Sequence, residues 1–193
     1  MINSHVLAFI GEQRAGKGTA AEIYRKISKK NSGRPEASRH TFSDAVREIL
    51  NERGIPFGRI AAQNLVMEMI DKDGSDTLSK LVEKRIWADP NKFIIIDGIR
   101  LWSDYRMMCR FPVHHLVYIT APAEIRYKRA ILNKDKSDES DISFEEFCER
   151  ENHRLERSIP AIGINAASHY IVNSGNLEEL GERMSELYDE IKF

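Results

Sequence analysis

The sequence predicts an α/β fold of three layers, a five-stranded parallel sheet between two layers of helices. The first observation is an alternation, because short apolar runs recur along the chain between longer segments with the pattern of amphipathic helices. The second is the run Phe93–Ile96, which is apolar throughout without alternation, as is typical of a strand buried on both faces. Both observations favour β-α units and a sheet that helices cover on both sides.

The elements follow from these patterns in chain order. The predicted strands are His5–Ile10, Ser38–Phe42, Lys92–Ile96, His115–Thr120 and His169–Val172. The predicted helices are Gly16–Lys30, Ser43–Arg53, Arg59–Ile70, Ser75–Trp87, Arg100–Arg110, Pro122–Asn133, Ser143–Ser158 and Asn176–Ile191. The segment from about residue 43 to about residue 88 holds more helix than one crossover needs, so we expect a helical insertion that binds an acceptor. The polar segment from about residue 133 to about residue 142 is expected to form a short lid.

Composition indicates one compact domain over residues 1–193, since 41% hydrophobic residues are enough to bury a core. The formal net charge of −1 gives no overall attraction to nucleic acid or anionic membranes, so any anion site must be local. No basic patch interleaved with aromatic residues indicates a nucleic-acid surface. The two cysteines lack zinc or disulfide spacing, and no apolar run has signal-peptide or transmembrane length. We therefore predict a cytoplasmic protein without a membrane partner, and the sequence leaves its oligomeric state open.

The run Gly-Glu-Gln-Arg-Ala-Gly-Lys-Gly-Thr follows the first predicted strand and opens the first predicted helix. This is the context of a phosphate-binding P-loop, in which backbone N–H groups, the helix N-terminus and a lysine hold a polyphosphate. The pattern predicts a P-loop NTPase fold and an ATP site. The nucleotide-binding residues are expected to be Gly11, Arg14, Ala15, Gly16, Lys17, Gly18 and Thr19, and Lys17 is expected to be catalytic as well. A chance glycine-rich turn is the alternative, and the combination of strand, lysine and helix disfavours it.

The loop departs from the strict pattern because Gly18 stands where a metal-binding hydroxyl is expected, with Thr19 one residue later. Gly-Lys-Gly-Thr resembles the loop of adenylate kinase and its nucleoside monophosphate kinase relatives. That resemblance implies Mg²⁺ that keeps much of its water shell, with Thr19 and Asp97 as its residues. Arg14 stands where these kinases usually have glycine, and either adds a charge near the γ-phosphate or points into solvent.

The run Asp97-Gly98-Ile99-Arg100 follows the strongest predicted strand and resembles the Asp-Gly-Phe-Pro-Arg element of adenylate kinases, without the proline. An aspartate at the carboxyl end of a central parallel strand lies where α/β sheets bind ligands. We expect Asp97 to be catalytic through metal-bound water and Arg100 to bind an acceptor phosphate. The alternatives are a helix cap for Asp97 and a surface position for Arg100.

The run His40-Thr41-Phe42-Ser43-Asp44-Ala45-Val46-Arg47 resembles the Ser-x-Gly-Asp-x-x-Arg element that begins the acceptor-binding helix of these kinases, without the glycine. The resemblance assigns Asp44 and Arg47 to acceptor binding, with Arg47 opposite Arg100. Helix initiation alone also explains Ser43 and Asp44, and Arg47 is otherwise a surface arginine.

Arginines on both sides of the predicted lid are candidates for closing over the phosphates, because phosphoryl transfer depends mainly on positioning and cations. Arg129 and Arg150 are the catalytic candidates, and Arg150, Arg154 and Arg157 are expected on one helix face. The alternative is a solvated helix with pairs such as Glu146–Arg150. Asn173 ends the last predicted strand and is expected to border the adenine pocket; a plain turn with Asn173 in a left-handed conformation is equally compatible.

Over nearly its full length the order of these elements resembles a P-loop nucleotide kinase of the adenylate kinase and dephospho-CoA kinase type, including archaeal-type nucleotide kinases grouped with the latter. The resemblance implies transfer of the γ-phosphate of Mg-ATP to a nucleoside or deoxynucleoside monophosphate. Ser43-Asp44-Ala45 matches only part of the Asp-Ala-Asp element of dephospho-CoA kinases, so a coenzyme A precursor is the second choice. A nucleotide-binding regulatory ATPase is the third possibility.

Overall fold

The computed structural model describes residues 4–32, 36–132 and 142–191. Its strands are β1 (His5–Ile10), β2 (Ser38–Thr41), β3 (Phe93–Ile99), β4 (Val113–Thr120) and β5 (His169–Val172). Its helices are α1 (Lys17–Ser32), α2 (Phe42–Glu52), α3 (Arg59–Asp73), α4 (Thr77–Ala88), α5 (Trp102–Met108), α6 (Ala123–Leu132), α7 (Phe144–Glu149), α8 (Ile159–Ala166) and α9 (Leu177–Ile191), with a 3₁₀ turn at Arg150–Asn152.

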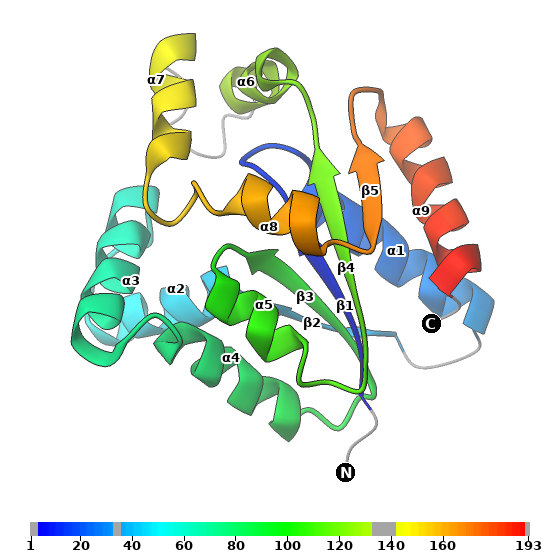
Figure 1. Cartoon of the computed structure of the whole chain (residues 1–193), viewed down its shortest axis with the longest axis horizontal. Helices are drawn as coiled ribbons and strands as arrows, with labels where there is room; N and C mark the ends of the chain where they lie inside the picture. The colour runs from blue at the N-terminus through cyan, green and yellow to red at the C-terminus, as the bar shows by residue number, and fades with distance from the viewer. Residues whose placement is uncertain (1–3, 33–35, 133–141, 192–193) are drawn as a thin grey trace.

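The five strands form one parallel sheet in the order β2-β3-β1-β4-β5, which confirms the predicted fold class. β1 lies in the middle, where Ala8 pairs with Ile96 on one side and Leu116 on the other. Helices cover both faces, with α1 and α9 on one side and α4, α5 and α8 on the other (Figure 1). Three helices, α2 to α4, lie between β2 and β3 in the chain, as the predicted insertion requires.

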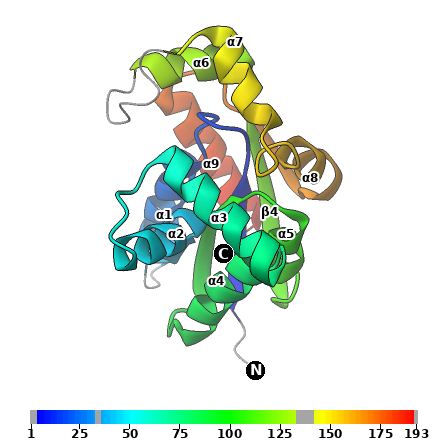
Figure 2. The ribbon, with the colours of Figure 1, turned by 90° about the vertical axis from the view of Figure 1, so that its left-hand side faces the viewer.

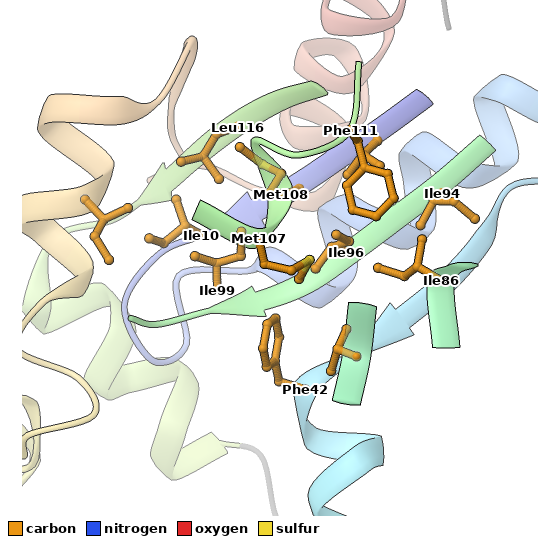
Figure 3. Close-up of a cluster of buried hydrophobic side chains, with 14 of the residues drawn as sticks. Ile10, Phe42, Ile86, Ile94, Ile96, Ile99, Met107, Met108, Phe111 and Leu116 are labelled. Carbon is orange, nitrogen blue, oxygen red and sulfur yellow. The ribbon is translucent and has the colours of Figure 1, made fainter. Parts of the chain in front are cut away.

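Two buried clusters hold the layers together, one on each face of the sheet. On the α1 and α9 face, Leu7 and Phe9 of β1 pack against Tyr24 and Met184. On the opposite face, Ile94 and Ile96 of β3 contact side chains of α2, α4 and α5 (Figure 3). Since successive residues of a strand face opposite sides, an unbroken apolar strand supplies both clusters at once.

β3 continues three residues further than predicted and therefore contains Asp97. Phe9 pairs with Asp97 and Ile10 pairs with Ile99, so Gly98 is one extra residue in β3 and forms a bulge, with φ of 98°. After the bulge, the N–H groups of Arg100 and Leu101 donate to the carboxylate of Asp104, at 3.0 and 2.9 Å. These two bonds hold the backbone before α5, so the helix begins at Trp102 and not at Arg100.

The predicted helix Ser143–Ser158 is wrong, because α7 ends at Glu149 and a 3₁₀ turn and further turns follow. Glu151 is paired with Arg126, and Glu156 is paired with Arg100. In a continuous helix, residues five apart point about 140° away from each other. The break lets each carboxylate face its own arginine, and it also means that the arginines of this segment do not share a helix face.

α8 was not predicted, although Pro160 at its first turn is a recognised start signal. The helix packs closely on β4: a Cβ at Gly163 would lie 2.6 Å from the ring of Tyr118. The predicted lid, residues 133–142, lies outside the described residues except for Ile142. The flanking helices α6 and α7 lie above the carboxyl ends of the strands (Figure 2). Within the described ranges, none of the helices has the length and apolar character needed to cross a bilayer.

The amino end of the sheet carries a titratable cluster. Burial lowers the pKa of His115 below its ordinary value of 6.5, as do His169, His114 and His5, whereas Glu190 acts in the opposite direction. The unfolded state therefore binds a proton at this position at higher pH than the folded state does, so the free energy of unfolding falls as the pH drops through 6.5.

We predict that His115→Gln makes the free energy of unfolding less dependent on pH between pH 7 and pH 5. Urea denaturation followed by circular dichroism measures this slope. His153→Gln, outside the cluster, is the matched control and should keep the slope of the parent protein. An identical slope in parent and His115→Gln would contradict the prediction.

Candidate functional site

The glycine-rich loop has the backbone geometry of a phosphate cradle. Arg14 and Gly16 both have positive φ, 59° and 102°, which turns the chain between β1 and α1. Behind the loop, the Asn173 side-chain amide donates to the carbonyl oxygen of Ala15 at 2.8 Å. A Cβ at position 16 would lie 2.3 Å from the same amide nitrogen. Asn173 therefore supports the loop from behind, and the left-handed conformation considered for it is not present.

Two further side chains of the loop are held by distant elements. The hydroxyl of Tyr118 donates to Glu12, and the Gln13 side-chain amide donates to the carbonyl oxygen of Phe147 at 3.0 Å. Arg126 also donates to the carbonyl oxygen of Gln13, at 3.4 Å. These supports come from β4, α6 and α7, and no local pattern in the sequence indicates them. The loop is thus fixed at positions 12, 13 and 15.

Lys17 is the cation at the centre of the loop. Its ammonium donates to the carbonyl oxygens of Gly11 and Glu12, at 2.8 and 2.9 Å. Burial, and to a smaller extent the nearby Arg100, lower the pKa of Lys17 from 10.5 to about 8, against the opposing effects of Asp97, Glu156 and Glu12. The charged form of Lys17 is therefore incompletely solvated, and a bound anion would stabilise it.

A cavity of about 1020 Å³ opens in front of the loop. The predicted residues that line it are Arg14, Gly16, Lys17, Gly18, Thr19, Asp44, Arg47, Asp97, Arg100 and Arg129. Sequence reasoning missed further lining residues, namely Arg39, Thr41, Ser43, Gly98 and Leu132. The structure thus gathers the predicted donor and acceptor residues, which are up to 115 positions apart (Arg14 to Arg129), in one cavity.

Four of the predicted residues do not line this cavity. Gly11 and Ala15 are buried in the loop itself, and Asn173 lies behind it. Arg150 follows α7 and donates to Glu146 at 3.2 Å, as the alternative of a solvated pair had it. Its contribution to the lid stays a prediction, since most of the lid is outside the described residues.

Arg129 of α6 has the features of a phosphate ligand. One guanidinium nitrogen, Nη1, is buried without a hydrogen-bond partner among the described residues, while Nη2 donates to the carbonyl oxygen of Gly175 at 3.2 Å. Burial also lowers the pKa of Arg129. A buried donor without an acceptor is costly in a folded protein, so an anion in the cavity would satisfy it.

Asp97 and Thr19, the two predicted metal residues, both line the cavity and carry oxygen atoms of the kind that Mg²⁺ prefers, as do Thr41, Ser43 and Asp44. Asp97 lies at the carboxyl end of β3 and forms an ion pair with Arg39 of β2. The residues present therefore fit Mg²⁺ held partly through water, and the loop N–H groups with Lys17 and Arg129 fit a polyphosphate.

The two predicted acceptor arginines line the same cavity as the loop. Arg47 donates to Asp44 at 2.5 Å, and its guanidinium carbon lies 4.3 Å from the centre of the Phe57 ring. Arg100 is paired with the buried carboxylate of Glu156, which also lies 3.5 Å from Arg59. Neither Glu156 nor Arg59 was singled out in the sequence, because the contacts join positions 56 and 97 apart.

A second cavity of about 620 Å³ adjoins the first and shares Ser43, Arg47, Gly98 and Arg100 with it. The remainder of its lining is largely apolar and comes from the insertion, including Phe57, Ile60, Val66, Met69, Ile70 and Leu78. A cavity lined by cations and a mainly apolar cavity are thus neighbours, and Arg47 and Arg100 line both.

Three solved structures have a similar fold over nearly the whole chain. A shikimate kinase from Bacteroides thetaiotaomicron has a TM-score of 0.62 and 14% sequence identity, over 96% of this chain and 98% of that chain. A shikimate kinase from Acinetobacter baumannii has a TM-score of 0.57 and 13% identity, over 100% of this chain and 97% of that chain. A shikimate kinase from Aquifex aeolicus has a TM-score of 0.50 and 15% identity, over 96% of each chain. The chain has the P-loop kinase fold. At these identities the likeness establishes the fold and leaves the finer resemblance to adenylate kinase and dephospho-CoA kinase as a prediction.

No protein-family model matches the chain. A curated relative from Archaeoglobus fulgidus, described as a UPF0200/UPF0201 protein, is 26% identical over 191 residues, which cover 97% of this chain and 56% of the relative. The chain thus spans about half the length of that relative.

The lowered pKa of Lys17 predicts that the binding of a nucleotide to the loop depends on pH. A bound polyphosphate favours charged Lys17, so ADP binding without metal should be accompanied by proton uptake near pH 8. The Kd for ADP in EDTA is expected to rise about tenfold from pH 7 to pH 9.

Calorimetry in two buffers with different ionisation enthalpies measures both the Kd and the proton uptake. Lys17→Met, which removes the titrating group, should bind ADP weakly at every pH and show no uptake at pH 8. Proton uptake that is the same in both proteins would contradict the assignment of Lys17 to the polyphosphate.

Proposed function

We propose that this protein transfers the γ-phosphate of Mg-ATP to a nucleoside or deoxynucleoside monophosphate. The observation that carries the proposal is the presence of Arg47 and Arg100 in the same cavity as the P-loop. A protein that only binds or hydrolyses ATP needs one phosphate site, whereas a kinase for a phosphorylated acceptor needs a second one.

The donor side is formed by the loop. Its backbone N–H groups and Lys17 would hold the β- and γ-phosphates, and Asp97 and Thr19 would hold Mg²⁺, partly through water. When bound, the metal supplies positive charge that offsets the charge of the phosphates. Lys17 and Arg129 add positive charge from the protein, and preorganised cations of this kind are the main means by which such folds accelerate phosphoryl transfer.

The acceptor side is formed by the insertion and the end of β3. Arg47 and Arg100 can each present two N–H groups to a phosphate, which suits a monophosphate ester better than a neutral hydroxyl compound. Beyond them, the apolar cavity of about 620 Å³ is of a size and character that suits a nucleobase, with Phe57 at Arg47 and Gln63 as a side-chain amide in its lining.

An acceptor screen tests this proposal. The purified protein is incubated with Mg-ATP and each of the ribonucleoside and deoxyribonucleoside monophosphates, dephospho-CoA and shikimate, and both ADP and the phosphorylated product are measured. Product from a monophosphate supports the proposal, and product from dephospho-CoA or shikimate alone assigns the fold to another small-molecule acceptor. ADP at the same slow rate with every acceptor would overturn the kinase proposal in favour of a regulatory ATPase.

Arg47→Ala and Arg100→Ala are each predicted to raise the KM for the acceptor by roughly tenfold or more, equivalent to about 1.4 kcal/mol or more of binding free energy. The KM for ATP should change little, because the loop holds ATP. Arg85→Ala, which removes a partner of Glu48 outside the cavity, is the control. If both variants have the acceptor KM of the parent protein, Arg47 and Arg100 do not form a second phosphate site.

Arg129→Ala is predicted to lower kcat by about 10²-fold while the Kd for ATP rises by a smaller factor, since a cation over the phosphates acts most strongly as charge develops. Single-turnover kinetics separates the chemical step from binding. Arg150→Ala, tested in parallel, decides whether the second predicted lid arginine contributes. A loss of ATP affinity alone in Arg129→Ala would make Arg129 a binding residue.

A further inference from the structure

Arg39 is a cavity residue without a role in the proposed donor or acceptor machinery. It lies on the edge strand β2, and its guanidinium forms an ion pair with the carboxylate of Asp97 at the end of β3. Asp97 is the better buried of the two, with 13% of its side chain exposed against 31% for Arg39. The pair thus lies at the position where the cavity would hold a divalent cation.

Gly18 explains why a guanidinium fits at this position. A Cβ at residue 18 would lie 3.2 Å from Nη2 of Arg39 and 3.6 Å from Oδ2 of Asp97. The side chain of a serine or threonine at residue 18 would therefore extend into the space that Arg39 occupies. The glycine that departs from the strict P-loop pattern thus leaves the room in which Arg39 packs.

Arg39 and a divalent cation would both bind the carboxylate of Asp97. Arg39 pairs with it directly, and Lys17 and Arg100 lie close enough for their charges to interact with it or with each other. A divalent cation bound to Asp97 in the presence of Arg39 would face a like charge at hydrogen-bond range. Repulsion between the two cations therefore disfavours their simultaneous presence on one carboxylate.

We propose that Arg39 is a positioning residue that competes with Mg²⁺ for Asp97, so that metal binding requires Arg39 to withdraw from the carboxylate into the phosphate cavity that it lines. The inference rests on the proposed function for its metal and nucleotide. Because the metal-competent state is only part of the population, the apparent metal affinity is reduced by that fraction. Arg39 thus weakens the binding of the metal to Asp97. When the metal binds, the guanidinium of Arg39 is released from that carboxylate.

The test measures metal coupling instead of turnover. The Kd for ADP is determined by calorimetry in EDTA and at saturating Mg²⁺, and the ratio of the two values is the coupling factor. In Arg39→Gln this factor is expected to rise by roughly 3- to 10-fold above that of the parent protein. Gly18→Ala, which keeps both partners and places a Cβ against Arg39, should change the factor in the same direction.

Three comparisons keep the proposal falsifiable. Arg53→Gln removes an arginine–carboxylate pair with Glu68, 2.8 Å apart, that does not line the cavity, and should leave the factor unchanged. Asp97→Asn and the double variant Arg39→Gln/Asp97→Asn should have the same factor, because Arg39 acts through Asp97. An unchanged or smaller factor in Arg39→Gln, or equal loss of ADP affinity with and without Mg²⁺, would overturn the proposal and make Arg39 a phosphate ligand.

If the parent protein binds no ADP at all, the proposed function falls, and the competition is then measured with Mn²⁺ alone by water-proton relaxation. Tighter Mn²⁺ binding in Arg39→Gln that is lost in the double variant would still support competition at Asp97. Equal Mn²⁺ binding in the parent protein and Arg39→Gln would refute it.

Discussion

The hydrogen bond from Asn173 to the carbonyl of Ala15 holds the glycine-rich loop against the end of β5, and the larger cavity depends on where that loop lies. The loop sets the direction of α1, the depth at which Lys17 is buried, and the distance from Gly18 to the end of β3. A phosphate cradle needs N–H groups that point inward without internal acceptors, so it cannot stabilise its own backbone. Supports from outside the loop, at Tyr118, Phe147 and Asn173, provide that stability.

Carboxylates hold three of the arginines that line the larger cavity. Arg39 is paired with Asp97, Arg47 with Asp44, and Arg100 with Glu156. This arrangement lets a chain with a formal net charge of −1 collect many guanidinium groups around one cavity without a large positive field. It also orients flexible side chains before a ligand arrives, which lowers the entropy lost on binding. An arginine that bound a phosphate would give up its carboxylate, and a carboxylate that bound a metal would give up its arginine, so the strength of each pair would affect ligand affinity.

The sequence predicted what local patterns determine and missed what distant contacts determine. Strands β1 and β5 and the loop after β1 were predicted at their observed positions, because an apolar run, glycines and a lysine act within a few residues. The end of α7 was not, since the chain there bends to bring Glu151 to Arg126 and Glu156 to Arg100. Arg39 carries no signal of its own in the sequence, and only the parallel pairing of β2 with β3 places it beside Asp97. Helix α8, in contrast, was not predicted although Pro160 is a local signal for its start.

The contact between Gly163 and Tyr118 connects the loop to α8, a helix that lines neither cavity. The backbone of α8 rests directly on one side of the Tyr118 ring, while the hydroxyl of the same residue holds Glu12 of the loop. Any side chain at residue 163 must push the ring or the helix aside, and the ring transmits that displacement to the cradle. Sequence variation at this remote, buried glycine would therefore act as a modifier of nucleotide affinity, and a survey restricted to cavity residues would overlook it.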